Sequence, residues 1–138
     1  MQNAPAVIFD NGSGVFKAGM GDDYTPRVVF PTIVGKPEKP NLMVGMDQKE
    51  LYVGPEAYQK RQLLLLEHPI KRGFIETKED MEKMEKIWQH TYENELVVDP
   101  RESPVLLTET PLNDIKKREE LLELFFENFK VKSFYLGI

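Results

Sequence analysis

The sequence predicts an α/β fold: a mixed β-sheet with helices packed against it and a small inserted subdomain. Short segments rich in β-branched and aromatic residues alternate with longer segments whose apolar residues recur at helical spacing. They follow the order β-β-β, an insert, then α-β-α-β. This alternation favours helices on a mixed sheet, and 138 residues suffice for one domain with a small appendage.

The first three strands are expected near the N-terminus. Residues 6–10 (AVIFD) and 15–20 (VFKAGM) flank the turn NGSG. Asn-Gly is a strong hairpin signal because its residues tolerate a positive φ angle. A third strand is expected over residues 27–34, where Pro31 indicates an edge strand or the point at which the chain leaves the sheet.

Residues 35–69 are expected to form the inserted subdomain, since prolines and glycines punctuate them. The only strand candidates in this stretch are residues 42–46 and 51–53. The larger unit is then made of residues 1–34 and 70–138.

The second half of the chain predicts two helices and two strands. A helix is expected over residues 77–96, where Thr77 and Asp80 resemble a capping box. Residues 105–109 form a strand, Asn113 caps a second helix to about residue 128, and residues 131–138 form a last strand. The expected apolar faces of the two helices are Met81, Met84, Ile87, Trp88, Tyr92 and Leu96, and Leu122, Phe125, Phe126 and Phe129.

Composition excludes several classes of function. The net charge of −5 does not favour nucleic acid, and no apolar stretch is long enough to predict membrane insertion. The chain has no cysteine, and its two histidines form no zinc pattern. Residues 73–138 carry nine bases against fifteen acids, so this half is acidic. Its acidic surface either attracts basic partners or is simply a set of solvated helix faces.

The segment Asp10-Asn11-Gly12-Ser13-Gly14 is the candidate site. A glycine-rich turn lets backbone N–H groups approach an anion, Ser13 adds a hydroxyl, and Lys17 adds a positive charge for phosphate. A carboxylate such as Asp10 suits Mg²⁺, which keeps most of its waters. An ordinary β-hairpin turn also explains these five residues. The segment matches neither the P-loop nor the GxGxxG pattern.

The chain resembles the actin family from about residue 7 to its end. The motifs that carry the resemblance are DNGSG, KAG, GDD, PR, FP-IVG, MVGM, QK, YVG, EA–KR, PI, DMEK, KIW-HT, NEL, LLTE and PLN. The resemblance implies a ribonuclease-H-like ATPase domain, with residues 1–34 and 70–138 as part of one subdomain and residues 35–69 as the small one. It also implies a cytoplasmic, cytoskeletal protein that binds ATP or ADP with Mg²⁺ and has actin-like subunits and actin-binding proteins as partners.

The resemblance assigns two sets of residues. Asp10 reaches the metal through water, and a filament contact lies in residues 39–50, although its methionines are equally explained by ordinary packing. The implied phosphate loop is Asp10, Gly12, Ser13, Gly14, Val15 and Lys17. The implied filament contacts are Lys39, Met43, Val44 and Met46.

Four departures from the family limit what is carried over. The N-terminal acidic cluster used for motor binding is absent, and Arg72 stands where conventional actins carry a modified histidine. A repeated Met-Glu-Lys, at residues 81–83 and 84–86, inserts three residues and rotates the helix face by roughly 60°. The chain also ends before the glutamine that positions water in actins and before the second phosphate loop.

These departures predict weak or absent nucleotide binding and little or no hydrolysis by the 138-residue chain alone. The leading interpretation is part of an actin-like protein that binds Mg-ATP and assembles into filaments. The alternative is a truncated module that binds or caps actin filaments without ATP turnover, and a third is an inert fragment. An apolar final strand favours truncation.

Overall fold

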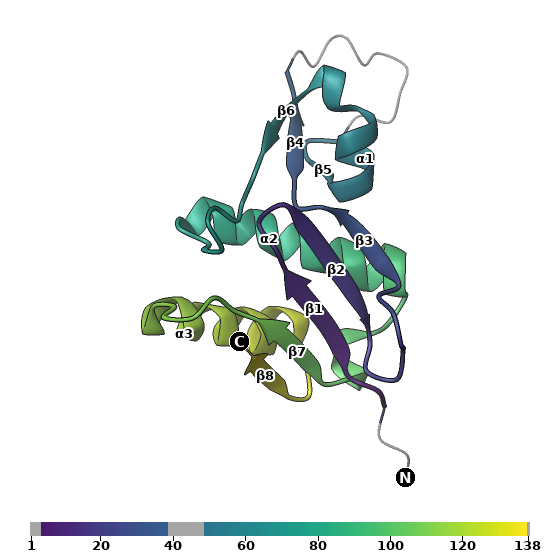
Figure 1. Cartoon of the computed structure of the whole chain (residues 1–138), viewed down its shortest axis with the longest axis vertical. Helices are drawn as coiled ribbons and strands as arrows, with labels where there is room; N and C mark the ends of the chain where they lie inside the picture. The colour runs from purple at the N-terminus through teal and green to yellow at the C-terminus, as the bar shows by residue number, and fades with distance from the viewer. Residues whose placement is uncertain (1–3, 39–48, 138) are drawn as a thin grey trace.

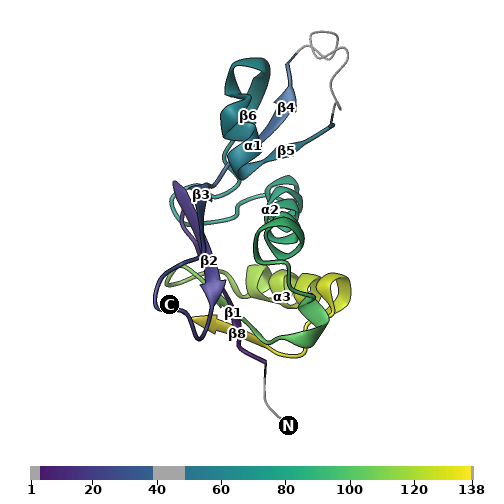
Figure 2. The same cartoon turned by 90° about the vertical axis from the view of Figure 1, so that its right-hand side faces the viewer.

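The computed structural model describes residues 4–38 and 49–137. They form a five-stranded sheet with two helical segments on one face and, beyond its end, a separate three-stranded sheet (Figures 1 and 2). The prediction of a mixed α/β fold in the order β-β-β, insert, α-β-α-β is confirmed.

The large sheet has the order β3-β2-β1-β7-β8. Its first three strands are antiparallel neighbours, whereas β1, β7 and β8 run parallel. The strands are β1 (Val7–Asn11), β2 (Val15–Met20), β3 (Val28–Pro31), β7 (Val105–Thr108) and β8 (Phe134–Gly137). The chain leaves this sheet after Pro31, as the proline predicted, because proline cannot donate to the ladder.

The three-stranded sheet has the order β5-β4-β6 and is antiparallel throughout. Its elements are β4 (Val34–Pro37), β5 (Tyr52–Val53), α1 (Gly54–Gln59), a 3₁₀ turn η2 (Arg61–Leu63) and β6 (Leu64–Glu67). The strand predicted at residues 51–53 is confirmed as β5, but the sequence prediction for this stretch did not include β4, α1 or β6. β4 ends in Gly-Lys-Pro, and the four leucines of residues 63–66 have no period that distinguishes a strand. The other strand candidate, residues 42–46, lies outside the described residues.

The first long helix begins where the capping box predicted. Thr77 Oγ1 accepts a hydrogen bond from the Asp80 backbone N–H at 3.0 Å. α2 (Lys78–His90) then continues as a π-helical turn, η3 (Thr91–Leu96). All six apolar residues predicted for its inner face are less than 10% exposed.

The second helix differs from its prediction in two ways. α3 (Ile115–Glu123) is capped by Asp114, whose carboxylate accepts the Lys116 N–H, while Asn113 bonds to Asp114 N–H instead. The helical segment continues as a π-helical turn, η5 (Leu124–Phe129). A separate 3₁₀ turn, η4 (Pro100–Glu102), precedes β7. Its buried face is Leu121, Leu124 and Phe125, with Leu122 and Phe126 exposed.

The main core lies between the large sheet and these two helices. Phe9 of the sheet meets Tyr92 and Phe125 of the helical segments through ring contacts at 5.1 Å and 6.4 Å, and Phe16 lies against Phe9 at 5.7 Å. Both helices lie on the same side of the sheet (Figure 2). Within the described residues, no helix is long and apolar enough to cross a bilayer.

Candidate functional site

The candidate site is the connection between β1 and β2. Strand register pairs Asp10 with Lys17 and Asn11 with Phe16, so residues 12–14 form the loop. Because strand residues alternate between faces, Phe9 and Phe16 enter the core while Asp10 and Lys17 lie exposed on the opposite face.

The predicted residues are therefore brought together at one end of the sheet. Ser13, Gly14 and Val15 are also exposed, and Val15 retains 46% of its accessible surface. A carboxylate, a hydroxyl and an ammonium group thus surround a short loop that is open to solvent.

The backbone of this loop differs from the expected Asn-Gly turn. Neither Asn11 nor Gly12 has a positive φ angle, and Asn11 is the last residue of β1. Gly12 is required for space, since a Cβ there would lie 2.4 Å from the Val15 carbonyl oxygen. Gly14 has no such neighbour: its Cβ would meet no described atom within 4 Å.

Thr32 holds the loop from behind. Its hydroxyl donates to the Gly12 carbonyl at 2.6 Å, and its backbone N–H donates to the Gly14 carbonyl at 3.1 Å. Thr32 is completely buried, so these bonds are shielded from water. Sequence reasoning missed this residue because its partners lie about 20 positions away and nothing local marks it.

Asn11 ties the start of the loop to the core. Its side-chain Oδ1 accepts from Trp88 Nε1 at 3.0 Å, and its Nδ2 donates to the Thr108 carbonyl at 3.3 Å. The Asn11 backbone N–H donates to Thr108 Oγ1 at 2.9 Å. Three elements, β1, α2 and β7, are thereby joined at one residue that the sequence suggested only as a turn former.

Thr108 also positions the candidate carboxylate. Its hydroxyl donates to Asp10 Oδ1 at 3.3 Å. Thr108 lies 98 positions from Asp10, and only the parallel pairing of β1 with β7 brings the two together.

The groups that face outward from the loop are unused. Among the described residues, no acceptor is bonded to the backbone N–H of Ser13 or of Gly14, and the Ser13 hydroxyl has no partner. Lys17 likewise forms no ion pair with any described side chain. The loop is therefore fixed on its inner side and offers free donors on its outer side.

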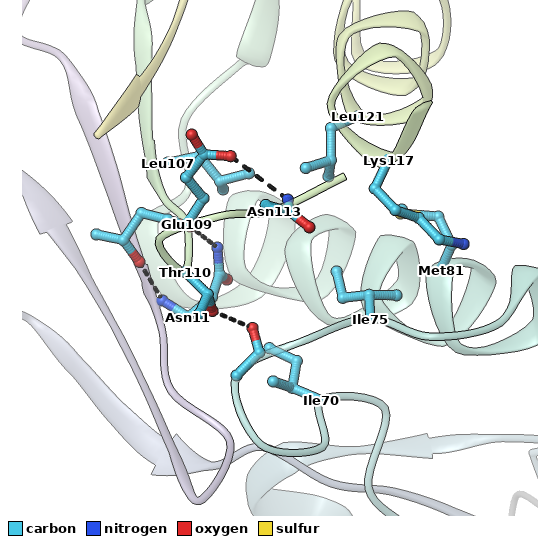
Figure 3. Close-up of a pocket in the computed structure, with 12 residues that line it drawn as sticks. Asn11, Ile70, Ile75, Met81, Leu107, Glu109, Thr110, Asn113, Lys117 and Leu121 are labelled. Carbon is cyan, nitrogen blue, oxygen red and sulfur yellow. Dashed lines mark hydrogen bonds between the residues drawn. The ribbon is translucent and has the colours of Figure 1, made fainter. Parts of the chain in front are cut away.

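Two hollows adjoin the site. The one behind the loop, lined by Asn11, Glu109, Asn113 and Leu121 among others (Figure 3), has a volume of only about 30 Å³. That is space for a water molecule or two and excludes a nucleotide. The other is a groove of about 240 Å³ on the open face of the sheet, which Asp10 and Lys17 both line.

Glu109, next to the site, is not a free carboxylate. Its side chain is 6% exposed and is bound by Arg118 at 2.9 Å and by Asn113 Nδ2 at 3.4 Å. This cluster fixes the connection from β7 to α3 and leaves Asp10 as the carboxylate that faces solvent beside the loop.

The donor set limits how a metal could be held. Within residues 4–38 and 49–137, no three carboxylate or histidine side chains come together as a metal site. A single exposed carboxylate at Asp10 fits Mg²⁺ that keeps its waters, and it does not fit a fully protein-ligated ion.

Two further predicted features lie elsewhere. The predicted filament contacts Lys39, Met43, Val44 and Met46 fall outside the described residues. Arg72 is exposed and has a φ angle of 55°, in a tight turn with Gly73 that hydrogen-bonded Lys71 and Phe74 close.

The chain was compared with models of known protein families. The family model described as Actin matches residues 1–138, the whole chain.

Proposed function

The chain belongs to the actin family, and from this premise we propose that its β1–β2 loop binds the phosphates of Mg-ATP or Mg-ADP. The observation that carries the proposal is the loop's two-sided construction. Thr32 and Asn11 fix it from the core side, while the Ser13 and Gly14 N–H groups have no acceptor among the described residues. Free, fixed backbone donors bind anions at little cost in reorganisation.

Each exposed residue of the loop then has a role. Ser13 and the backbone at Gly14 and Val15 donate to phosphate oxygens, and Gly12 gives the loop its close turn. Lys17 supplies a positive charge from the neighbouring strand. Asp10, held by Thr108, binds Mg²⁺ through water, and the ion would neutralise phosphate charge.

Calorimetric titration of the chain with Mg-ATP tests this proposal. A single phosphate loop should bind weakly, and we expect this weak binding to be saturable and to fall by at least about tenfold in Asp10→Ala, the effect of losing one charge-assisted contact. Asp22→Ala is the matched control, because Asp22 is an exposed acid in the next turn without a described partner. Equal loss in both variants, or no binding by a chain with a cooperative unfolding transition, would refute the proposal.

We also propose filament assembly through the inserted unit of residues 35–69. The described part of this unit is a small sheet of its own, in which Tyr52, Ala57 and Leu64 form a core together with Ile33, just before the unit. Sedimentation of the chain with actin filaments, compared with a Met43→Asp/Met46→Asp variant, tests the predicted contact. Unchanged co-sedimentation of the variant would remove that loop from the contact.

A second candidate function is an interaction module that needs no nucleotide. It is favoured by a hollow of about 450 Å³ between α2 and α3. The acids that line it are Glu82, Glu85, Glu120, Glu123 and Glu127. Filament binding that survives Asp10→Ala but falls with Glu85→Lys/Glu123→Lys would favour this function over the first.

A further inference from the structure

The turn between β2 and β3 contains a run of three residues that the fold leaves free. Tyr24, Thr25 and Pro26 are all exposed, and Tyr24 keeps its full accessible surface. Within the described part of the chain, no hydrogen bond or ion pair involves any of the three, whereas the flanking Gly21, Asp23 and Arg27 are all anchored. The run can therefore be drawn into another protein's groove at little cost to the fold.

Thr25-Pro26 is one of three Ser/Thr-Pro pairs in the sequence. Ser103, before Pro104, is 4% exposed and lies directly ahead of β7. Thr110, before Pro111, donates its hydroxyl to the Gly73 carbonyl. Only Thr25 has a hydroxyl that is both exposed and unbonded.

We propose that Thr25 is a phosphorylation site for a proline-directed Ser/Thr kinase, an enzyme class that requires proline directly after the acceptor. The Thr25 hydroxyl oxygen attacks the γ-phosphorus of ATP, and the bond from that phosphorus to the β,γ-bridging oxygen breaks. ADP leaves, and the kinase's catalytic base takes the hydroxyl proton. The product is a phosphothreonine that carries nearly two negative charges at neutral pH.

The position of Thr25 gives this charge a consequence. Thr25 lines the same 240 Å³ groove as Lys17 and Asp10. Its phosphate would face the Lys17 ammonium and would compete with Asp23 for Arg27, whose side chain now lies 2.7 Å from that carboxylate. The first effect neutralises the positive charge of Lys17, and the second leaves the Asp23 carboxylate without its Arg27 partner. Both therefore oppose the binding of a second anion, such as a nucleotide phosphate, at the loop. This part of the inference rests on the proposed function, so phosphorylation should weaken Mg-ATP binding.

The first experiment maps phosphorylation and does not depend on nucleotide affinity. Two samples are compared: the folded chain, and a urea-unfolded chain that is diluted into assay buffer. Each is treated with a purified cyclin-dependent kinase and ATP, and the phosphorylated residues are mapped by mass spectrometry. We expect phosphate on Thr25 alone in the folded chain and on additional Ser/Thr-Pro pairs in the unfolded sample. Thr25→Ala and Pro26→Ala should abolish modification of the folded chain, whereas Tyr24→Phe should not. Phosphate on Ser103 or Thr110 of the folded chain, or none on Thr25, overturns the assignment.

The second experiment compares Mg-ATP affinity before and after modification. We expect the dissociation constant to rise about threefold, the size expected for two doubly charged groups across a solvent-filled groove, and the rise to shrink at high salt. An unchanged constant for stoichiometrically phosphorylated chain overturns the regulatory effect. Failure of the unmodified chain to bind Mg-ATP instead refutes the proposed function, and the mapping result then stands alone.

Discussion

The two faces of the five-stranded sheet are made by alternate residues of the same strands, yet they differ in almost every property. On the covered face, Phe9, Phe16 and Leu107 are at most 1% exposed and pack against α2 and α3. On the open face, Asp10 and Lys17 lie in solvent, and Tyr135 retains 59% of its surface. Strand alternation thus places each reactive side chain next to a residue that is buried.

The comparison indicates that the residues that stabilise the site differ from those that would bind a ligand. Of the residues that hold the loop, Asn11 is bonded to Trp88 on the covered side and Thr32 is itself buried, whereas Asp10 and Lys17, which would meet a ligand, lie on the open face. Stability and binding should therefore respond to different substitutions, even where the substituted residues are neighbours in sequence.

The largest expected effect comes from removing an aromatic side chain of α2 that packs against the covered face. Trp88 is fully buried, its ring meets that of Phe125 in a tilted contact at 5.0 Å, and its Nε1 donates to Asn11 Oδ1. Trp88→Ala should lower the free energy of unfolding by about 3–5 kcal/mol, because it leaves a cavity and an unpaired Asn11 oxygen. Urea unfolding followed by circular dichroism measures this.

The matched variant on the open face is Tyr135→Ala. It should change the free energy of unfolding by less than about 0.5 kcal/mol, since Tyr135 has no described hydrogen bond and is largely exposed. Similar losses for the two aromatic residues would mean that the open face is not open in solution.

Substitutions at the two glycines of the loop should distinguish effects on stability from effects on ligand binding. Gly12→Ala places a Cβ 2.4 Å from the Val15 carbonyl oxygen, so the backbone must move, and we expect about 1–3 kcal/mol of destabilisation. Gly14→Ala meets no described atom and should leave the thermal midpoint within a degree or two of the parent.

For Gly14→Ala the effect should appear in binding instead, because the added methyl group stands where a phosphate would approach the backbone. Differential scanning fluorimetry and Mg-ATP titration of both variants give the two readouts. If Gly14→Ala bound Mg-ATP as tightly as the parent, the phosphate would have to lie away from this part of the loop.

Local sequence signals were sufficient to predict the elements whose pattern is periodic. The buried face of α2, its Thr77 cap and the alternation of β1 and β2 all follow from residues close together in the chain. The exit at Pro31 has an equally local cause. These elements were predicted correctly because one residue type, or one spacing, decides them.

Features that depend on distant partners could not be predicted. Thr108 and Trp88 act on the loop from positions 77 to 98 residues away, and only the sheet order makes them neighbours. β6 was missed because four consecutive leucines have no period, although three of them, Leu63, Leu65 and Leu66, prove exposed. The shift of the α3 cap to Asp114 shows that adjacent Asn and Asp residues cannot be separated by propensity alone.

A smaller and opposite effect is expected at the edge of the covered face. The Tyr92 hydroxyl is buried without a hydrogen-bond partner among the described residues, and burial raises the pKa of Tyr92 well above its ordinary value. Tyr92→Phe removes this unpaired group and keeps the ring contact with Phe9, so it should stabilise the chain by about 1 kcal/mol. Tyr58→Phe, at a half-exposed tyrosine, serves as the control for thermal unfolding and should have no effect. Destabilisation by Tyr92→Phe would show that the hydroxyl has a partner, such as a buried water.

The smallest effect concerns the ion pair that joins the small sheet to α2. Glu67 of β6 contacts Lys83 of α2, and Lys83 also lies 3.8 Å from Asp80. The hydrogen bond from Lys83 holds the pKa of Glu67 below its ordinary 4.5, and the one to Glu67 raises the pKa of Lys83 above 10.5. The unfolded chain therefore binds more protons than the folded chain just below pH 4.5, so stability falls as the pH drops through that range. At alkaline pH, the contribution of the Glu67–Lys83 ion pair to stability is lost as the pH rises through the pKa of Lys83 in the folded chain.

Between these limits the pair should contribute about 0.5 kcal/mol, because the Glu67 side chain is 36% exposed and solvent screens it. Lys83→Met should remove this contribution at pH 7, and the difference from the parent should vanish below the pKa of Glu67 in the folded chain. Lys86→Met, one helical turn away at an exposed lysine without an ion pair to a described residue, is the control. Urea midpoints measured from pH 3 to pH 8 provide the test. A Lys83→Met difference that stayed constant across this range would assign the effect to packing of the lysine stem and not to the ion pair with Glu67.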